Sequence, residues 1–280
     1  MMIIPSTRKI KIIALDMDGT LLNDNKQVSR DNYETITQAM EQGIYIVPAT
    51  GRIKSALPKE ILNHPKISYG ICSNGAAIMN LKTGNVLFRC NLNRKLVLDI
   101  LEELAEFDII IDIFADGKIM TEEENKKRLD EFEMSDLMKE FVQSSRTYIP
   151  CLVDFVTKEA VHIERFNIFY KTLEQKAALC KRLSKYPQVV IASSLFNNLE
   201  VNMQGADKGT ALMWLANYLS IPAEETMAIG DSDNDTTMIK KAGIGVAMGN
   251  AIQDIKDVAD DITLTNEEDG VAYSIRKYLF

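Results

Sequence analysis

Four short segments place reactive side chains at the carboxyl ends of expected core strands: Asp16 and Asp18 in DMDGT, Thr50 in ATGR, Lys208 in ADKGT, and Asp231 with Asp235 in GDSDND. A carboxylate can act as a nucleophile, as a proton-transfer group or as an oxygen ligand of a hard cation. We expect Asp16 to be ionised at neutral pH without help from its neighbours. The lysine and the threonine add a positive charge and a hydroxyl donor. The set therefore suits chemistry on an anionic substrate.

The first third of the chain predicts a strand, a helix and a second strand that place two of these segments together. Residues 10–15 form a β-branched run typical of a strand buried on both faces, and residues 44–49 form another. Ser29 is the expected N-cap of the helix between them. In such a βαβ unit the strands are parallel, so Asp16 and Thr50 are expected at one edge of the sheet. Side chains alternate along an extended segment, so Asp18 should project to the same side as Asp16.

The middle of the chain has a different pattern. Asp116-Gly117 lies between alternating apolar runs and predicts a β-hairpin, and a second hairpin is predicted around Asn197. From residue 207 the alternation of strand and helix resumes, as if the first sheet were completed there. We therefore predict a discontinuous α/β core formed by residues 1–90 and 204–280, with an inserted α+β domain of residues 91–203.

Composition narrows the possible functions. The 280 residues are 46% hydrophobic and 26% charged, which is typical of a globular protein, and the net charge of -8 disfavours binding to nucleic acid. The four cysteines are scattered without a C-x-x-C pair, so we interpret them as reduced thiols and not as zinc ligands. The amino terminus fits neither a signal peptide nor a membrane span, which predicts a cytoplasmic protein without a membrane partner, as a monomer or weak homo-oligomer.

Together and in this order, the segments resemble the haloacid dehalogenase superfamily and, within it, the Cof-type hydrolases of class IIB. The matching stretches are DMDGTLL at 16–22, ATGR at 49–52, SNGA at 73–76, ADKG at 206–209, GDSDNDTTM at 230–238 and GN at 249–250. The resemblance covers essentially the whole chain. It implies a Rossmann-like core with a parallel sheet and a cap with an antiparallel sheet. It also implies a Mg²⁺-dependent phosphatase of small phosphorylated metabolites such as sugar phosphates.

The resemblance assigns roles to the acidic residues. Asp16 would be the nucleophile that forms an aspartyl-phosphate, and Asp18 the general acid/base, a role that requires neighbours to raise its pKa. Asp231 would hold Mg²⁺ together with Asp16 and the main-chain carbonyl of Asp18. Asp235 would not bind the ion itself but would support the residues that do. A calcium loop is rejected for GDSDND, because the glutamate position of such a loop is occupied by Ala242.

The remaining matching residues would bind the substrate. Lys208 would screen the charges of the nucleophile and of the transferring group, and the hydroxyl of Thr50 would contact phosphoryl oxygens. Arg52 either reaches the substrate or pairs with an acid, and both readings stay open. The other predicted substrate-binding residues are Gly51, Asn74 and Asn234.

Two other functions remain open at this stage. Some enzymes that resemble this core and cap are phosphomutases, which return the phosphoryl group to a sugar, and the motifs do not separate the two activities. A non-enzymatic regulator that binds a metabolite is the other alternative. An acid/base at Asp18 has no use in a protein that only binds its ligand, which argues against this second possibility.

Overall fold

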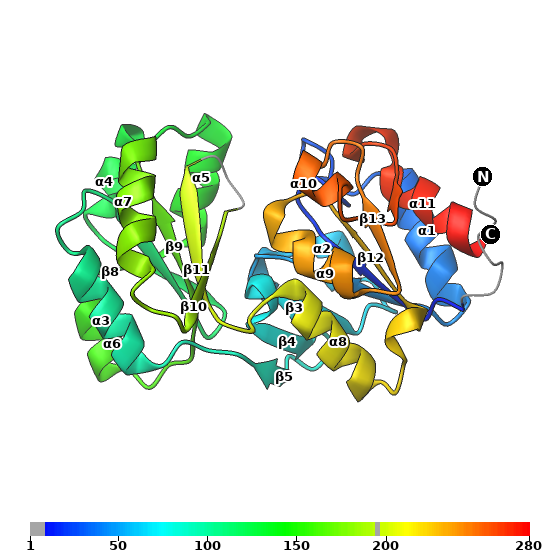
Figure 1. Cartoon of the computed structure of the whole chain (residues 1–280), viewed down its shortest axis with the longest axis horizontal. Coiled ribbons are helices and arrows are strands. Elements are labelled where there is room, and N and C mark those ends of the chain that lie inside the picture. Colours follow the sequence, from blue (N-terminus) through cyan, green and yellow to red (C-terminus); the bar gives the residue numbers. More distant parts are fainter. Residues whose placement is uncertain (1–8, 194–196) are drawn as a thin grey trace. The chain divides into compact units, whose positions relative to one another are not determined.

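The computed structural model describes residues 9–193 and 197–280. The chain divides into two compact units, a core unit of Met1–Phe88 with Asp207–Phe280 and a cap unit of Arg89–Ala206 (Figure 1). The predicted domain limits, after residues 90 and 203, lie within three residues of these limits.

The core unit is built on a five-stranded sheet with the order β14-β13-β12-β1-β2, in which every neighbouring pair is parallel. Its strands are β1 (Ile12–Leu15), β2 (Tyr45–Pro48), β12 (Thr226–Gly230), β13 (Ile244–Ala247) and β14 (Asp261–Ile262). All four residues of β1 are buried, as expected of a central strand covered on both faces. The parallel α/β core predicted from the sequence is confirmed.

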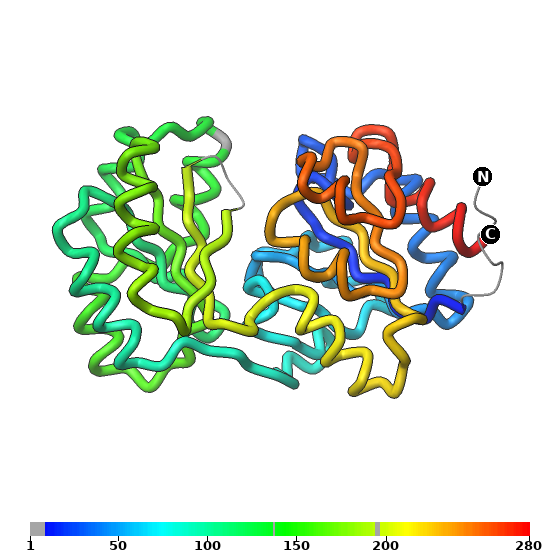
Figure 2. The backbone as a smooth tube through the Cα atoms, viewed as in Figure 1, coloured from blue at the N-terminus to red at the C-terminus, as the bar shows by residue number. Residues whose placement is uncertain are grey.

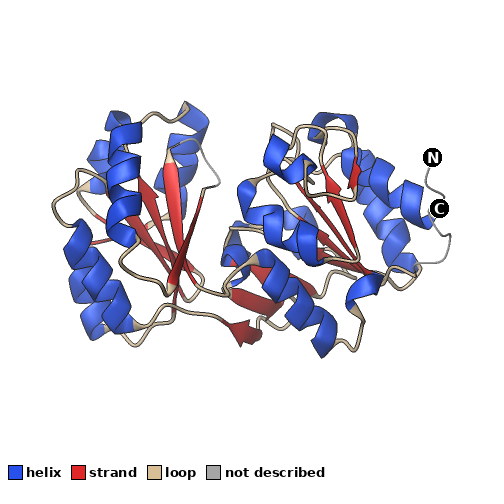
Figure 3. Cartoon of the chain, in the orientation of Figure 1, coloured by secondary structure: helices blue, strands red, loops and turns tan. Residues whose placement is uncertain are grey.

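Helices lie on both faces of this sheet (Figure 3). They are α1 (Arg30–Glu41), α2 (Lys59–Leu62), α8 (Lys208–Tyr218), α9 (Thr236–Lys241), α10 (Gln253–Lys256) and α11 (Gly270–Leu279). Short 3₁₀ turns join them at Lys54–Ala56, Ser73–Gly75, Ala223–Glu225, Asp233–Asp235 and Asn266–Glu268. The predicted N-cap is confirmed, because the Ser29 hydroxyl accepts a hydrogen bond from the Asn32 amide at 3.1 Å.

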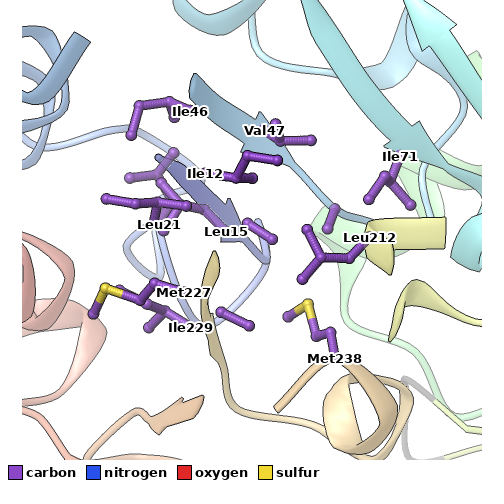
Figure 4. Packing of buried hydrophobic residues seen from close by; sticks show 14 of the residues in the cluster. Ile12, Leu15, Leu21, Ile46, Val47, Ile71, Leu212, Met227, Ile229 and Met238 are labelled. Carbon is purple, nitrogen blue, oxygen red and sulfur yellow. The ribbon is translucent and has the colours of Figure 1, made fainter. Parts of the chain in front are cut away.

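Side chains from the strands and from the covering helices interlock in the core interior (Figure 4). Ile12 and Leu15 of β1 pack with Val47, Met227 and Ile229 from the neighbouring strands. Leu212 of α8 and Met238 of α9 belong to the same cluster, which joins the helices to the sheet. Burying one such side chain stabilises the fold by roughly 1.5–3 kcal/mol. The strand ends are therefore anchored on a closely packed base.

A smaller sheet with the order β3-β4-β5 adjoins β2. Its strands are β3 (Tyr69–Cys72), β4 (Ala77–Asn80) and β5 (Val86–Arg89), and β3 pairs antiparallel with β4. The Thr50 amide donates to the Ile71 carbonyl at 2.9 Å, next to a parallel bridge between Ala49 and Ile71. This link places the turn that follows β3 beside the carboxyl end of β2.

The cap unit contains a six-stranded sheet with the order β10-β11-β9-β6-β7-β8. The strands are β6 (Ile110–Ala115), β7 (Lys118–Glu122), β8 (Thr147–Ile149), β9 (Ile163–Phe169), β10 (Val189–Ala192) and β11 (Asn198–Met203). The pairing is antiparallel except between β7 and β8, which run parallel. The hairpin at Asp116 and Gly117, with φ of 44° and 72°, is confirmed. The connection predicted at Asn197 includes residues 194–196, which lie outside the described part.

Five α-helices are described in the cap unit: α3 (Arg94–Leu104), α4 (Asn125–Arg128), α5 (Asp136–Ser145), α6 (Leu152–Lys158) and α7 (Leu173–Leu183). Apolar residues of α3, α6 and α7 pack with one face of the sheet in a single cluster. The sheet also carries buried ion pairs: Asp112 of β6 with Arg146, which directly precedes β8, at 2.7 Å, and Arg165 of β9 with Glu200 of β11 at 3.0 Å. One sheet thus combines an apolar layer with buried charge.

The segments that enter and leave the cap unit run close together (Figure 2), since the Cys90 thiol contacts the Gln204 carbonyl at 3.7 Å. The longest helix described is α1, with 12 residues. No helix in residues 9–193 and 197–280 has the length and the apolar content needed to cross a bilayer.

Candidate active site

Three strands of the core sheet end together beside the predicted residues. Leu15, the last residue of β1, is in register with Pro48 of β2 and with Ile229 of β12. The Asp16 amide then donates to the Ile229 carbonyl at 3.0 Å. Asp16, Thr50 and Asp231 therefore leave the sheet at the same edge, where parallel α/β sheets bind their ligands.

Lys208 lies at the centre of the acidic group at this edge. Its ammonium donates to Asp16 Oδ1 at 2.6 Å and to Asp235 Oδ1 at 2.7 Å, and the side chain is fully buried. Lys208 is the first residue of α8, whose N-cap Asp207 accepts from the Thr210 amide at 2.7 Å. A Cβ at Gly209 would lie 2.3 Å from the Thr237 carbonyl oxygen, so only glycine lets α8 begin this close to α9.

Asp16, Asp231 and Asp235 form a carboxylate cluster in which one oxygen from each residue lies within 4.8 Å of the others. Asp231 accepts hydrogen bonds of 2.8 Å from the hydroxyls of Thr20 and Ser232. Asp235 Oδ2 accepts from the amides of Asp231 and Ser232 at 3.0 Å each. Asp235 thus fixes both Lys208 and the loop that carries Asp231.

A glycine brings the loop after β1 against this cluster. Gly19 has a φ of +81°, which L side chains rarely adopt, and a Cβ there would lie 2.6 Å from Asp231 Oδ2. Its carbonyl accepts from the Asn250 side chain at 2.8 Å. Asn250, which belongs to the GN motif, accepts in turn from the Asn266 amide at 3.0 Å.

The electrostatics of the cluster favour a bound cation. Burial raises the pKa of Asp16, and the neighbouring carboxylates of Asp235 and Asp231 raise it further. The Lys208 ammonium lowers it, but the resulting pKa of Asp16 stays well above its usual value. Burial and Asp235 also raise the pKa of Asp231. Although burial lowers the pKa of Lys208, its two carboxylate partners raise it more, so the ammonium stays charged. Lys208 is thus the neighbour that favours the ionised form of Asp16.

The donor set fits a hard divalent ion such as Mg²⁺. All three residues offer carboxylate oxygens, and when they are ionised the cluster has a formal charge of −2 with the Lys208 ammonium included. Asp235 is completely buried, and its oxygens accept from Lys208 and from two main-chain amides. Asp16 and Asp231 are more accessible and are consequently the side chains placed to bind a metal directly.

Asp18 has opposite surroundings. Arg52 donates to both of its oxygens, from Nε to Oδ2 and from Nη2 to Oδ1, at 2.7 Å each, and Lys26 Nζ lies 3.0 Å from Oδ1. Burial raises the pKa of Asp18, but the hydrogen bonds and charges of Arg52 and Lys26 lower it to about 2. The prediction that neighbours raise this pKa is wrong for the present arrangement. Of the two readings of Arg52, the structure shows the pairing with an acid.

The remaining predicted residues form a third group at the ends of β2 and β3. The Thr50 hydroxyl accepts from the Arg52 amide at 3.1 Å, which leaves the hydroxyl hydrogen to be donated. Asn74 Oδ1 accepts from Asn234 Nδ2 at 3.1 Å, and a Cβ at Gly51 would lie 2.9 Å from the same oxygen. Asn74 has a φ of 56°, a conformation that asparagine tolerates better than most residues.

Four residues with clear places at the site were absent from the sequence predictions: Thr20, Lys26, Ser232 and Asn250. Thr20 and Ser232 lie inside the DMDGT and GDSDND segments, and Asn250 lies in the GN pair, so the motifs contained their signal. Nothing in the sequence around Lys26 distinguishes it from other surface lysines.

Comparison with known proteins agrees with this geometry. A model of the haloacid dehalogenase-like hydrolase family matches residues 13–275. The Bacillus subtilis phosphatase YwpJ is 35% identical, with 96% of this chain and all of that protein covered. The B. subtilis 5-amino-6-(5-phospho-D-ribitylamino)uracil phosphatase YcsE is also 35% identical, with 96% of each chain covered.

A solved structure gives the same result for the fold. A haloacid dehalogenase-like hydrolase from B. subtilis superposes with a TM-score of 0.83 and 36% identity, and the alignment covers 97% of this chain and 100% of the other. The match therefore includes the core and the cap. This chain belongs to the haloacid dehalogenase-like hydrolase family.

Proposed function

We propose that this chain, a phosphatase of its family, hydrolyses small phosphorylated metabolites such as sugar phosphates through an aspartyl-phosphate on Asp16, with Mg²⁺ as cofactor. The observation that supports this most directly is the buried Lys208 ammonium, 2.6 Å from Asp16 inside a carboxylate cluster. Its charge reduces the repulsion between an anionic nucleophile and an anionic phosphoryl group.

In the first step, an Asp16 oxygen forms a bond to phosphorus while the ester bond breaks. The leaving oxygen takes a proton from Asp18, which lies two residues from the nucleophile on the same loop. To hold that proton at neutral pH, Asp18 must loosen its contacts with Arg52 and Lys26, because these contacts keep its pKa near 2. We therefore expect substrate binding to rearrange this ion pair.

In the second step, Asp18 accepts a proton from water as the water oxygen bonds to phosphorus. The bond between Asp16 and phosphorus breaks, inorganic phosphate leaves, and both carboxyl groups return to their starting forms. Thr50 is the proposed hydroxyl donor to the phosphoryl oxygens. Asn74 and Asn234, which are hydrogen-bonded to each other, are the proposed amide donors.

Asp16 and Asp231 would hold Mg²⁺, while Asp235 would orient Asp231 and Lys208. When bound, the ion supplies positive charge that offsets the negative charge of the transferring phosphoryl group. The net charge of -8 favours a small metabolite over a nucleic acid as substrate.

The test is phosphate release from a panel of phosphate monoesters, with and without Mg²⁺. The panel should contain sugar phosphates, p-nitrophenyl phosphate and a phosphorylated sugar alcohol, because the relative YcsE is named for a phosphoribityl compound. We expect Mg²⁺-dependent release that falls at least about 10³-fold in Asp16→Asn, since loss of a nucleophile is among the largest effects known. Acid-quenched mass spectrometry should locate one phosphoryl group on the Asp16 peptide.

Three outcomes would contradict the proposal. Activity retained by a folded Asp16→Asn protein would reject the nucleophile, and equal release without Mg²⁺ would reject the cofactor. Transfer of phosphate between positions of a sugar, dependent on a bisphosphate activator and without net release, would identify a mutase instead.

A further inference from the structure

Lys26 occupies a tight turn in the segment that follows the DMDGTLL motif. Its amide donates to the Asn23 carbonyl at 2.9 Å, and the next amide, of Gln27, donates to Asn23 Oδ1 at 2.9 Å. Lys26 has a φ of 61°, in the left-handed region that glycine and asparagine adopt more easily than lysine. The turn alone therefore gives no reason for a lysine at this position.

The charges around Asp18 give Lys26 a distinct position. The guanidinium of Arg52 meets both oxygens of Asp18 and donates a further bond to the Ala56 carbonyl at 2.8 Å, so the Arg52 and Asp18 charges balance. Lys26 Nζ, 3.0 Å from Asp18 Oδ1, is then a surplus positive charge. The nearest acid in the sequence, Asp24, accepts from the Asn266 side chain at 3.2 Å.

The Lys26 head group is also accessible to a ligand. Its side chain is 45% exposed, whereas the Arg52 side chain is 18% exposed and the Lys208 side chain is fully buried. An ammonium has three hydrogens to donate, and the contact with Asp18 uses only one. Lys26 therefore presents both charge and donors to the surroundings of Asp18.

We infer that Lys26 is a specificity-determining residue that selects phosphate monoesters whose leaving group carries an anionic or acceptor-rich substituent near the ester oxygen. The inference rests on the proposed function, because Asp18 marks the place of the leaving oxygen only if it is the general acid. A carboxylate, a second phosphate or clustered hydroxyls near that oxygen are attracted to Lys26. An ammonium in the same place is repelled.

Three simple alkyl monoesters separate these cases: 3-phosphoglycerate has an anionic leaving group, glycerol 3-phosphate a neutral one, and phosphoethanolamine a cationic one. We expect kcat/KM of the wild type to fall in that order. Lys26→Asn keeps a residue suited to the turn but removes the charge, and should reduce the ratio between the anionic and the cationic substrate by about fivefold. Lys26→Arg should retain the ratio.

Lys240→Asn is the matched control, since it makes the same change of net charge at an exposed position of α9. It should leave all three kcat/KM values unchanged. An unchanged ratio in Lys26→Asn overturns the inference. An equal loss on all three substrates also overturns it, because Lys26 would then serve every substrate alike.

A binding measurement separates this inference from the proposed function. Calorimetry with the Asp16→Asn protein and with the Asp16→Asn, Lys26→Asn double variant gives dissociation constants for the same three esters without turnover. The ratio of these constants should also fall by about fivefold in the double variant. If the wild type releases no phosphate from any ester, the proposed function fails together with the inference that rests on it. Intact phosphate release with an unchanged binding ratio rejects the role of Lys26 alone.

Discussion

Asp16 and Asp18 are separated by a single residue, yet they lie in opposite electrostatic surroundings. The Asp16 side chain is 8% exposed and shares one ammonium with Asp235, whereas the Asp18 side chain is 42% exposed and lies between an arginine and a lysine. The pKa of Asp16 is raised and that of Asp18 is lowered. Identical side chains in one motif thus receive different electrostatic properties from different partners.

The residue between them explains how this contrast is maintained. Met17 is completely buried in the core cluster, so the backbone is anchored between the two carboxylates. The loop around Gly19 is held by Asn250, and Thr20 binds Asp231. Each acid is therefore presented to its own set of partners.

Asp18→Asn is expected to have the largest effect among the variants that test this contrast. It preserves size but removes the proton-transfer group, so turnover of alkyl phosphates should fall by about 10²–10⁴-fold. The loss in the first step on p-nitrophenyl phosphate should be much smaller, because that leaving group departs without a proton, whereas the second step should slow equally for both substrate types. Rapid-quench measurement of leaving-group release in the first turnover, on both substrate types, isolates the first step.

Asp16→Asn is the control for this experiment, because it should affect both substrate types equally. If Asp18→Asn also slowed the first step equally on both substrate types, the two acids would not have separate roles, and the contrast between them would be electrostatic only.

Thr20→Val tests whether the surroundings of Asp231 prepare it for a metal. The substitution keeps the shape and removes the 2.8 Å hydrogen bond to Asp231 Oδ1. We expect the Mg²⁺ concentration for half-maximal activity to rise by about tenfold, the lower end of effects seen when a ligand loses its orienting partner. A titration of activity against Mg²⁺ measures it.

Thr37→Val provides the comparison, since the Thr37 hydroxyl donates to the Tyr33 carbonyl within α1, away from the cluster. Both variants are expected to lower the melting temperature slightly. A Thr20→Val protein with an unchanged Mg²⁺ requirement would show that this bond only stabilises the loop.

Arg52→Met should have the smallest effect, visible as a change in acid stability. A pKa lowered from 3.8 to about 2 in the folded state stabilises the fold above about pH 4, and this contribution disappears as the pH falls towards 2. Because Asp18 is substantially exposed, solvent screening reduces the contribution to about 1 kcal/mol. The variant should therefore lose more free energy of unfolding, relative to wild type, at pH 5 than at pH 3.

Urea unfolding at a series of pH values measures this difference. Arg30→Met is a suitable control, because Arg30 pairs with Glu34 on the exposed side of α1. A pH-independent loss in Arg52→Met would mean that the side chain acts through packing and not through the charge of Asp18.

The sequence predicts the neighbours of Asp16 better than those of Asp18. The strand ends and the motifs place Asp16, Lys208 and Asp231 at one sheet edge, and the structure joins them with short contacts. The pairing of Asp18 with Arg52 was only one of two open readings, and Lys26 had no signal. Which partner a charged side chain selects depends on loop geometry, and periodicity carries no information about that geometry.

In the cap, too, the sequence does not show which partner a charged side chain selects. Alternation and turn residues predict its hairpins, but β9 also carries Glu164, Arg165 and Asn167 among apolar residues. Arg165 finds its partner Glu200 on the adjacent strand β11 only through strand pairing that the sequence does not specify. Buried ion pairs of this kind are visible only once the register is known.

The order of strands in the core sheet has a consequence for biosynthesis. β1, which is followed directly by Asp16, pairs with β12, and Lys208 is 192 residues further along the chain than Asp16. At a ribosomal speed of 5–20 residues per second, roughly 10–40 seconds pass between the synthesis of Asp16 and that of Lys208. At the end of that interval the nascent chain contains the whole cap but only β1 and β2 of the five strands of the central sheet. The pairing of β1 with β12 therefore forms only after the last part of the chain has been synthesised.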